Sequence, residues 1–205
     1  LAMLYENTPG VELESIYLIG DFAVKAAVSQ AAAKPRCVRL SPQFSLAKES
    51  DVTADGDLVA AGYPFYAGRM SVTHQVKLEA PADGQRVVLE LAQLQAVLAK
   101  VRVNGRDAGT IAWAPYEADI TNAVRDGENE IEIELVTSLR NLLGPHHRSN
   151  GEPDNTWRTA FDYNVNVNQD AEHAEELENY WVDDYFVLEF GLGGPAKVKY
   201  LSPAK

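Results

Sequence analysis

Residues 101–147 read VRVNGRDAGTIAWAPYEADITNAVRDGENEIEIELVTSLRNLLGPHH, and this stretch decides the fold. The pair Asn104-Gly105 lies between apolar runs, which predicts a tight hairpin turn whose central residues adopt positive φ. Farther on, Ile131, Ile133 and Leu135 alternate with glutamates. Alternation at a period of two predicts a strand with one buried face and one acidic, solvated face. We therefore expect antiparallel strands joined by short turns.

Similar short strand patterns occur on both sides of this stretch. We expect strands at Ser15–Ile19, Phe22–Val28, Cys37–Leu40, Met70–Leu78, Val87–Leu91, Val97–Val103, Tyr185–Phe190 and Val198–Leu201. Turn signals such as Ser41-Pro42 and Asp126-Gly127 separate these runs. Many short strands with turns between them are typical of a sandwich or barrel, and the sequence shows no alternation of strands with helices. The fold class that follows is all-β, an antiparallel β-sandwich.

Two longer connections interrupt the pattern. One is a polar loop over 50–68, which ends in the aromatic run Gly62–Gly68; the other is a long excursion over 145–183. The excursion contains the pattern of a short helix at Ala171–Asn179. Long connections either carry function or cover a sheet edge, and both interpretations stay open. We expect residues 1–205 to form a single β-sandwich domain with long loops and one short helix.

The composition limits the classes of partner. A net charge of −12 disfavours nucleic acid and anionic membrane surfaces, because both attract basic patches. The lone Cys37 cannot form an internal disulfide and is expected at a buried strand position. Both the cytosol and export are compatible with this composition. The chain begins at Leu1 and enters strand-like sequence almost at once, so we expect a fragment of a longer polypeptide without its native N-terminus.

The central motifs resemble a known family. They are the Asn104-Gly105 turn, the Gly109–Trp113 strand, Pro115-Tyr116, Asp119-Ile120-Thr121 and Gly127–Ile131. Together they resemble the sugar-binding, jelly-roll domain of glycoside hydrolase family 2 and related bacterial glycosidases, whose fold is called galactose-binding-like. The resemblance is tightest over about Val97–Leu143. Gly62–Gly68, Leu142–His147 and Trp181–Tyr185 resemble accessory sandwich regions of large bacterial glycosidase-like proteins.

This resemblance implies a non-catalytic carbohydrate-binding or scaffolding module of a glycoside hydrolase-like protein. In such proteins a separate barrel carries catalysis, so no catalytic residue is transferred to this chain. The expected partner is a carbohydrate or a neighbouring catalytic domain of the same polypeptide. Two alternatives stay open, which are a hydrolase acting on glycosidic bonds within this chain and a protein-interaction module with aromatic loops as its interface.

Candidate ligand residues are aromatic rings and nearby polar side chains in loops. Flat rings stack on the C–H faces of sugars, while amides, guanidinium groups and imidazoles bind hydroxyls. The candidates are Tyr63, Tyr66, Trp113, Tyr116, Arg140, Asn141, His146, His147, Trp157 and Trp181. The competing interpretation places the rings over the ends of the core and lets the histidine pair bond to backbone or solvent.

The acidic pair Asp183-Asp184 is a weak candidate for a structural calcium site, and no other cofactor is expected. Neighbours on a strand point to opposite faces, so the two carboxylates are not expected to form a glycosidase acid pair. A zinc site at His146-His147 is disfavoured because no cysteine or acidic residue lies at ligand spacing.

Overall fold

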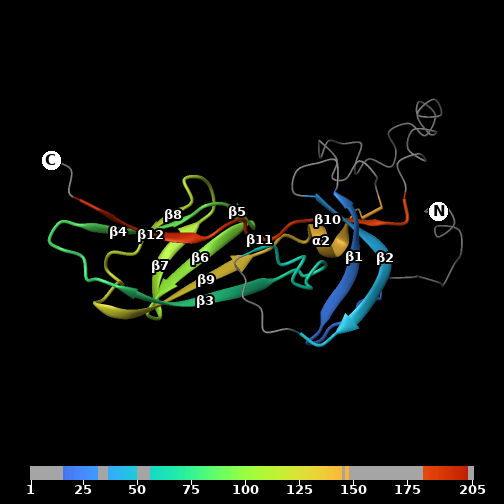
Figure 1. Cartoon of the computed structure of the whole chain (residues 1–205), viewed down its shortest axis with the longest axis horizontal. Coiled ribbons are helices and arrows are strands. Elements are labelled where there is room, and N and C mark those ends of the chain that lie inside the picture. The colour runs from blue at the N-terminus through green and yellow to red at the C-terminus, as the bar shows by residue number, and fades with distance from the viewer. Residues whose placement is uncertain (1–15, 32–36, 50–55, 145, 148–181, 203–205) are drawn as a thin grey trace, which may run out of the picture.

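The computed structural model describes residues 16–31, 37–49, 56–144, 146–147 and 182–202 (Figure 1). Within these ranges the chain forms several antiparallel sheets and one short helix, which confirms the all-β class and the antiparallel sandwich. The strands gather into two groups at opposite ends of the long axis in Figure 1. We call them the larger lobe, built around β4 (Arg86–Leu91), β6 (Leu98–Val103) and β9 (Gly127–Val136), and the smaller lobe, built around β1 (Ala23–Ala31) and β2 (Cys37–Ala47). Among the described residues no helix has the length and apolarity needed to cross a membrane.

The larger lobe is a sandwich of two main sheets. One sheet has the order β3-β9-β6-β7, with strands Arg69–Leu78, Gly127–Val136, Leu98–Val103 and Arg106–Ile111. The other has the order β12-β4-β8, with strands Ala196–Leu201, Arg86–Leu91 and Glu117–Asp119. A short two-stranded sheet pairs β11 (Gly191–Leu192), which precedes β12 in the chain, with β5 (Leu94–Gln95), which follows β4.

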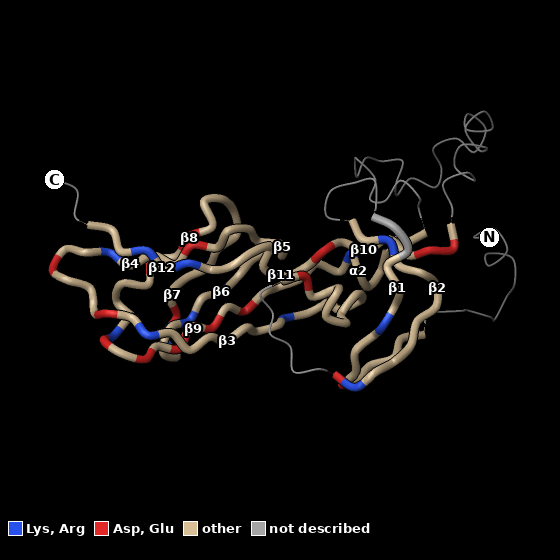
Figure 2. The backbone as a smooth tube through the Cα atoms, in the orientation of Figure 1, with Lys and Arg blue, Asp and Glu red and all other residues tan. Residues whose placement is uncertain are grey.

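The predicted alternation along β9 is confirmed. Ile131, Ile133 and Leu135 are buried in the core between the sheets, where each buried side chain contributes about 1.5–3 kcal/mol. The intervening glutamates face outward, but they do not form a purely acidic face. Strand β6 lies alongside and places Lys100 opposite Glu134, at an Nζ–Oε1 distance of 3.5 Å. Figure 2 accordingly shows acidic and basic residues intermingled over this sheet.

The predicted hairpin turn is also confirmed. Asn104 and Gly105 have φ of 53° and 76°, so both adopt the left-handed conformation that a primed turn requires. The turn is fixed by a fully buried side chain, Asn129. Its Oδ1 accepts hydrogen bonds from Asn104 Nδ2 at 2.8 Å and from the Arg125 N–H at 2.9 Å, while its Nδ2 donates to the carbonyls of Arg125 and Gly127. One buried amide therefore links the turn at Asn104-Gly105 to the turn at Arg125–Gly127.

The smaller lobe is a sheet of order β1-β2-β10, with strands Ala23–Ala31, Cys37–Ala47 and Tyr185–Leu188. A second hydrophobic cluster of Leu40, Val59 and Val187 lies under it, with Phe44, Phe65 and Tyr185 packed around. Cys37 is buried on β2, as predicted. The helix α2 (Arg140–Leu143) follows β9 and contacts β10.

Two strand predictions in this lobe are wrong. Residues 16–19 form no strand, and their apolar side chains lie on the surface. Strand β2 does not end before Ser41-Pro42 but continues to Ala47. Pro42 is tolerated because the β1–β2 register shifts between Val28↔Leu40 and Ala26↔Phe44, and β10 pairs with β2 only over 37–40. The helix predicted at Ala171–Asn179 lies outside the described residues. The division into domains stays a prediction.

Candidate functional site

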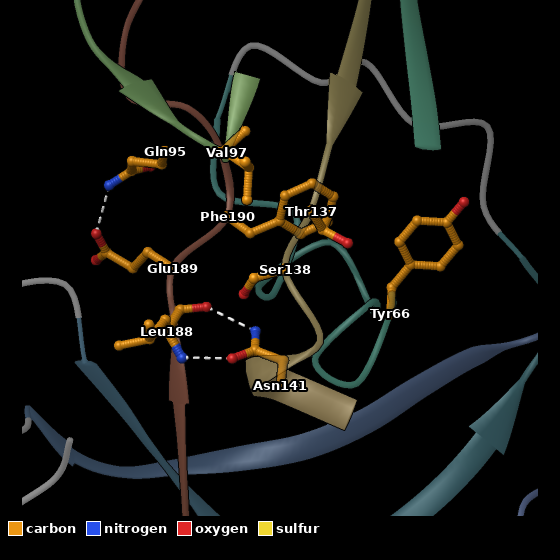
Figure 3. Close-up of a pocket in the computed structure, with 10 residues that line it drawn as sticks. Tyr66, Gln95, Val97, Thr137, Ser138, Asn141, Leu188, Glu189 and Phe190 are labelled. Carbon is orange, nitrogen blue, oxygen red and sulfur yellow. Dashed lines mark hydrogen bonds between the residues drawn. The ribbon is translucent and has the colours of Figure 1, made fainter. Parts of the chain in front are cut away.

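The two lobes meet at a pocket of about 170 Å³. We call it the junction pocket (Figure 3). Segments far apart in the sequence build it: Tyr66, the strand β5 and the residues after it, the two residues that follow β9, the helix α2 and the link from β10 to β11. Its lining residues are Tyr66, Gln95, Ala96, Val97, Thr137, Ser138, Asn141, Leu188, Glu189 and Phe190.

Asn141 fixes one side of this pocket. It lies on α2, where its side chain is only 6% exposed. Its Nδ2 donates to the Leu188 carbonyl at 2.8 Å, and its Oδ1 accepts from the Leu188 N–H at 2.8 Å (Figure 3). The side-chain amide thus satisfies both backbone hydrogen-bonding groups of Leu188, as a neighbouring strand would. Both ends of its side chain are bonded to backbone, which favours the structural interpretation of this candidate ligand residue.

Polar side chains and rings line the rest of the pocket. Gln95 Nε2 donates to Glu189 Oε2 at 2.6 Å, joining β5 to the β10–β11 link. Ser138 Oγ accepts a hydrogen bond from the Arg140 N–H at 3.2 Å at the start of α2. The rings of Tyr66 and Phe190 stack with centroids 6.1 Å apart and planes 11° apart. The pocket therefore combines a carboxylate, a hydroxyl and apolar surface.

An aromatic cluster stands beside the junction pocket. His146 and His147 both contact the ring of Tyr185, with ring centroids 5.6 and 4.4 Å away. His146 Nε2 bonds to the Asn141 carbonyl at 2.8 Å. Burial lowers the pKa of His146 below its ordinary value, the charge of nearby Arg140 acts in the same direction, and the bond to Asn141 opposes both. His146 is therefore favoured in its neutral form.

The backbone around these histidines brings together the two ends of the long excursion. The Val182 N–H donates to the His147 carbonyl at 3.0 Å, and the Phe186 N–H donates to the His146 carbonyl at 2.7 Å. His147 Nδ1 also bonds to the Val182 carbonyl at 3.1 Å. The chain therefore leaves and re-enters the described fold at one place. These bonds to backbone match the competing interpretation of the histidine pair.

A second, larger cavity of about 720 Å³ lies on the smaller lobe, and we call it the apolar groove. Segment 16–20 forms one side of it, and its other lining residues are Phe22, Val24, Leu46, Gly62, Tyr63, Pro64, Phe65, Tyr66, Ala67, Leu142, His146 and Tyr185. Tyr63 donates its hydroxyl hydrogen to Glu49 Oε1 at 2.6 Å. Burial and this hydrogen bond raise the pKa of Tyr63 to about 12, so the phenol stays protonated. The groove is therefore lined mainly by uncharged side chains.

The structure separates the predicted ligand residues. Tyr66 and Asn141 line the junction pocket, whereas Tyr63, Tyr66 and His146 line the apolar groove. Trp113 is 78% exposed between β7 and β8, and Tyr116 packs against the core of the larger lobe, so neither lines these cavities. Arg140 lies on α2 and His147 in the aromatic cluster. Trp157 and Trp181 lie outside the described residues.

Sequence reasoning missed Gln95, Ser138 and Glu189. They come from a two-residue strand, the residues that follow β9 and a short link, where no periodic pattern marks a side chain as functional. The proximity of Gln95 and Glu189, 94 positions apart, depends on pairing between β5 and β11. No local signal in the sequence could have revealed it.

The acidic pair is also separated. Asp184 Oδ2 accepts from Arg39 Nε on β2 at 2.6 Å, which ties the start of β10 to its neighbour, while Asp183 is exposed. Across the described part of the chain no three His, Cys, Asp or Glu side chains group closely enough to hold a metal ion. The described residues therefore give the predicted calcium site no support.

Comparisons with known proteins identify relatives of part of this chain. It is 33% identical over 84 residues to "Putative beta-glucuronidase" from Formosa agariphila, and the match covers 40% of this chain and 7% of that protein. No family model matches the sequence. The curated relative agrees with the resemblance to glycosidases, and the chain is related to glycoside hydrolases over that part of its length.

Two solved structures are also similar. A rhamnosidase from Novosphingobium sp. PP1Y has a TM-score of 0.43 and 18% identity, covering 93% of this chain and 16% of that chain. A beta-D-glucuronidase from Dictyoglomus thermophilum has a TM-score of 0.41 and 18% identity, covering 90% of this chain and 27% of that chain. The chain thus spans only a small part of the length of each relative.

Proposed function

We propose that this chain is a non-catalytic β-sandwich module of a larger glycoside hydrolase-like protein, and that its smaller lobe packs against another domain of the same polypeptide. The observation that carries this proposal is an exposed apolar strip that forms one side of the apolar groove, made of the four consecutive residues 16–19. Ile16 and Ile19 are 94% and 96% exposed, and Leu46, which also lines the groove, is exposed.

The energetics favour a covered strip. Burying one isoleucine or leucine side chain stabilises an interface by about 1.5–3 kcal/mol, so covering Ile16, Leu18 and Ile19 contributes several kcal/mol. Contiguous apolar surface of this kind is typical of an interaction site. The curated relative supports a partner in the same polypeptide, because the segment it shares with this chain is 7% of its length. The charge of −12 also disfavours an anionic membrane surface as the occupant.

The test compares one double variant in two settings. Ile16→Asp with Ile19→Asp changes two side chains that are exposed in this structure, so the isolated chain should keep its thermal midpoint. In the full-length gene product, the same change would place two charges in an apolar interface, and we expect a lower midpoint and weaker protection of residues 16–22 from hydrogen exchange. Trp113→Asp, an exposed apolar residue on the larger lobe, is the matched control. Equal midpoints for the double variant and full-length wild type would contradict the proposal.

A further inference from the structure

The apolar strip, residues 16–19, has the composition of a β-strand but no strand beside it. Its sequence Ile-Tyr-Leu-Ile consists of β-branched, aromatic and aliphatic residues, types that suit a pleated and covered surface. It leads through the bend at Gly20-Asp21 into β1 of the smaller lobe (Figure 1). Within the described ranges, no strand pairs with the strip, and its N–H and C=O groups make no backbone hydrogen bond. The strip therefore has strand-forming residues and free backbone groups together.

The side chains of the strip are apolar in both directions. Successive side chains of a strand point to opposite faces, so Ile16 and Leu18 would share one face, and Tyr17 and Ile19 the other. All four are exposed in this structure. A strand with one solvated face alternates apolar and polar residues, as β9 does, whereas a continuous apolar run is typical of a strand covered on both faces. The composition of the strip thus matches a strand inside a covered sheet.

The backbone of the strip sets a condition on whatever covers it. A domain that packs on the four side chains also removes water from at least one edge of the backbone. Buried N–H and C=O groups almost always have hydrogen-bonding partners in native proteins, because an unpaired buried group is costly. The neighbouring groove wall supplies mainly apolar side chains, among them Phe22, Leu46 and Phe65. The covering domain must therefore bring the hydrogen-bonding partners itself.

We infer that the apolar strip pairs with an edge strand of a neighbouring domain in the same polypeptide, so that a β-sheet forms across the two domains. This inference rests on the packing function proposed above and specifies the partner of the strip. An edge strand presents a row of unpaired N–H and C=O groups at strand spacing, and addition of a strand to such an edge is a recurrent mode of recognition. It satisfies alternate residues of the strip, while apolar side chains on either side of the pair cover Ile16 and Ile19.

The length of the strip favours a partner in the same polypeptide over a second copy of the chain. Even a complete two-stranded hairpin is only marginally stable in water, and the strip offers four residues. A ladder this short holds two separate molecules together poorly, because association has to offset the loss of translational and rotational freedom. Linkage within one polypeptide raises the effective concentration of the partner strand to about the millimolar range.

The first test measures hydrogen exchange at single amides of residues 16–19, in the isolated chain and in the full-length gene product. In the isolated chain these amides should exchange almost as fast as in an unfolded peptide. In the full-length protein an edge strand should slow two alternate amides, 16 and 18 or 17 and 19, by at least about 100-fold and leave the other two fast. Uniform protection of all four amides, or protection of none, would overturn the inference. Concentration-dependent slowing in the isolated chain would point to a second copy and would also overturn it.

Proline variants give a second readout, which burial of side chains alone does not change. Leu18→Pro and Ile19→Pro each remove one N–H, and only one of two successive residues donates to a single neighbouring strand. In the full-length protein, one proline variant should lower protection of the paired amides at least about tenfold below its alanine counterpart, Leu18→Ala or Ile19→Ala, and the other should not. Proline and alanine variants that behave alike at both positions would contradict strand pairing.

The controls separate this inference from the packing proposal. Asp83→Pro should be neutral in both settings, because Asp83 is exposed at the second position of the turn closed by the Gln85 N–H and the Ala82 carbonyl, where proline is favoured. If the Ile16→Asp, Ile19→Asp variant lowers the midpoint of the full-length protein but exchange shows no alternation, packing holds and pairing is refuted. An unchanged midpoint without protection of residues 16–19 would refute both.

Discussion

Replacing Asn141 with alanine tests whether this candidate ligand residue is instead a clamp that holds α2 to β10. The change removes both hydrogen bonds to Leu188, each 2.8 Å long, and leaves a part-buried N–H and carbonyl without their partner. Each backbone group left unsatisfied costs about 1–3 kcal/mol, and partial access to water brings the sum to about 3 kcal/mol. For a chain of this length that loss lowers the thermal midpoint by about 6–12 °C.

The assay combines urea unfolding followed by circular dichroism with hydrogen exchange at the Leu188 amide. Asn141→Ala should lower the free energy of unfolding by about 3 kcal/mol and accelerate exchange at Leu188. Asn122→Ala is the matched control, because Asn122 is exposed in the turn after β8 and should change stability by less than about 0.5 kcal/mol. If Asn141→Ala matched this control and Leu188 stayed protected, the clamp would be refuted.

Three further predictions concern other parts of the fold. Asn129→Ala breaks four hydrogen bonds of a fully buried amide, so we expect a loss of about 3–5 kcal/mol in urea unfolding, and a loss under about 1 kcal/mol would disprove the locking role. Gly191→Ala would place a Cβ 2.2 Å from the Gly56 carbonyl oxygen at a φ of +143°, so the thermal midpoint should fall sharply; an unchanged midpoint would contradict the close approach. Burial in the folded chain lowers the pKa of His146, so on acidification this side chain takes up a proton in the unfolded chain before it does in the folded one, and stability is lost as the pH falls below about 6.5. His146→Gln should therefore flatten the decrease in the free energy of unfolding from about pH 7 to about pH 5. An unchanged pH dependence in this variant would rule out His146 as the cause.

The accuracy of the sequence predictions follows the range of the interactions involved. The hairpin at Asn104-Gly105 was predictable because positive φ at two successive residues is a local requirement. Residues 16–19 were wrongly predicted as a strand because an apolar run carries the same local signal whether it enters a sheet or lies exposed at a groove. The passage of β2 through Pro42 depends on a register shift against β1, which is a property of the pair and not of one strand.

The candidate site was less predictable than the fold. Of the aromatic and amide residues predicted as ligands, Tyr66 and Asn141 line the junction pocket, and their role as ligands stays a prediction. Their partners Gln95, Ser138 and Glu189 carry no pattern of their own, because short strands and links have too few residues to show a period. The outward glutamates of β9 were predicted as an acidic face, yet β6 places Lys100 and Arg102 against them at 3.5 and 3.4 Å.

By itself, the sequence determined that this chain forms antiparallel strands with one buried face each, and where its tight turns lie. Those properties depend on alternation and on backbone preferences over a few residues. Only the tertiary structure decided which strands meet, that two hydrophobic clusters form, and that Gln95 and Glu189 share a pocket across 94 positions. Such contacts arise from pairing and packing between distant segments, whose energies belong to the assembled sheets and not to any local stretch of residues.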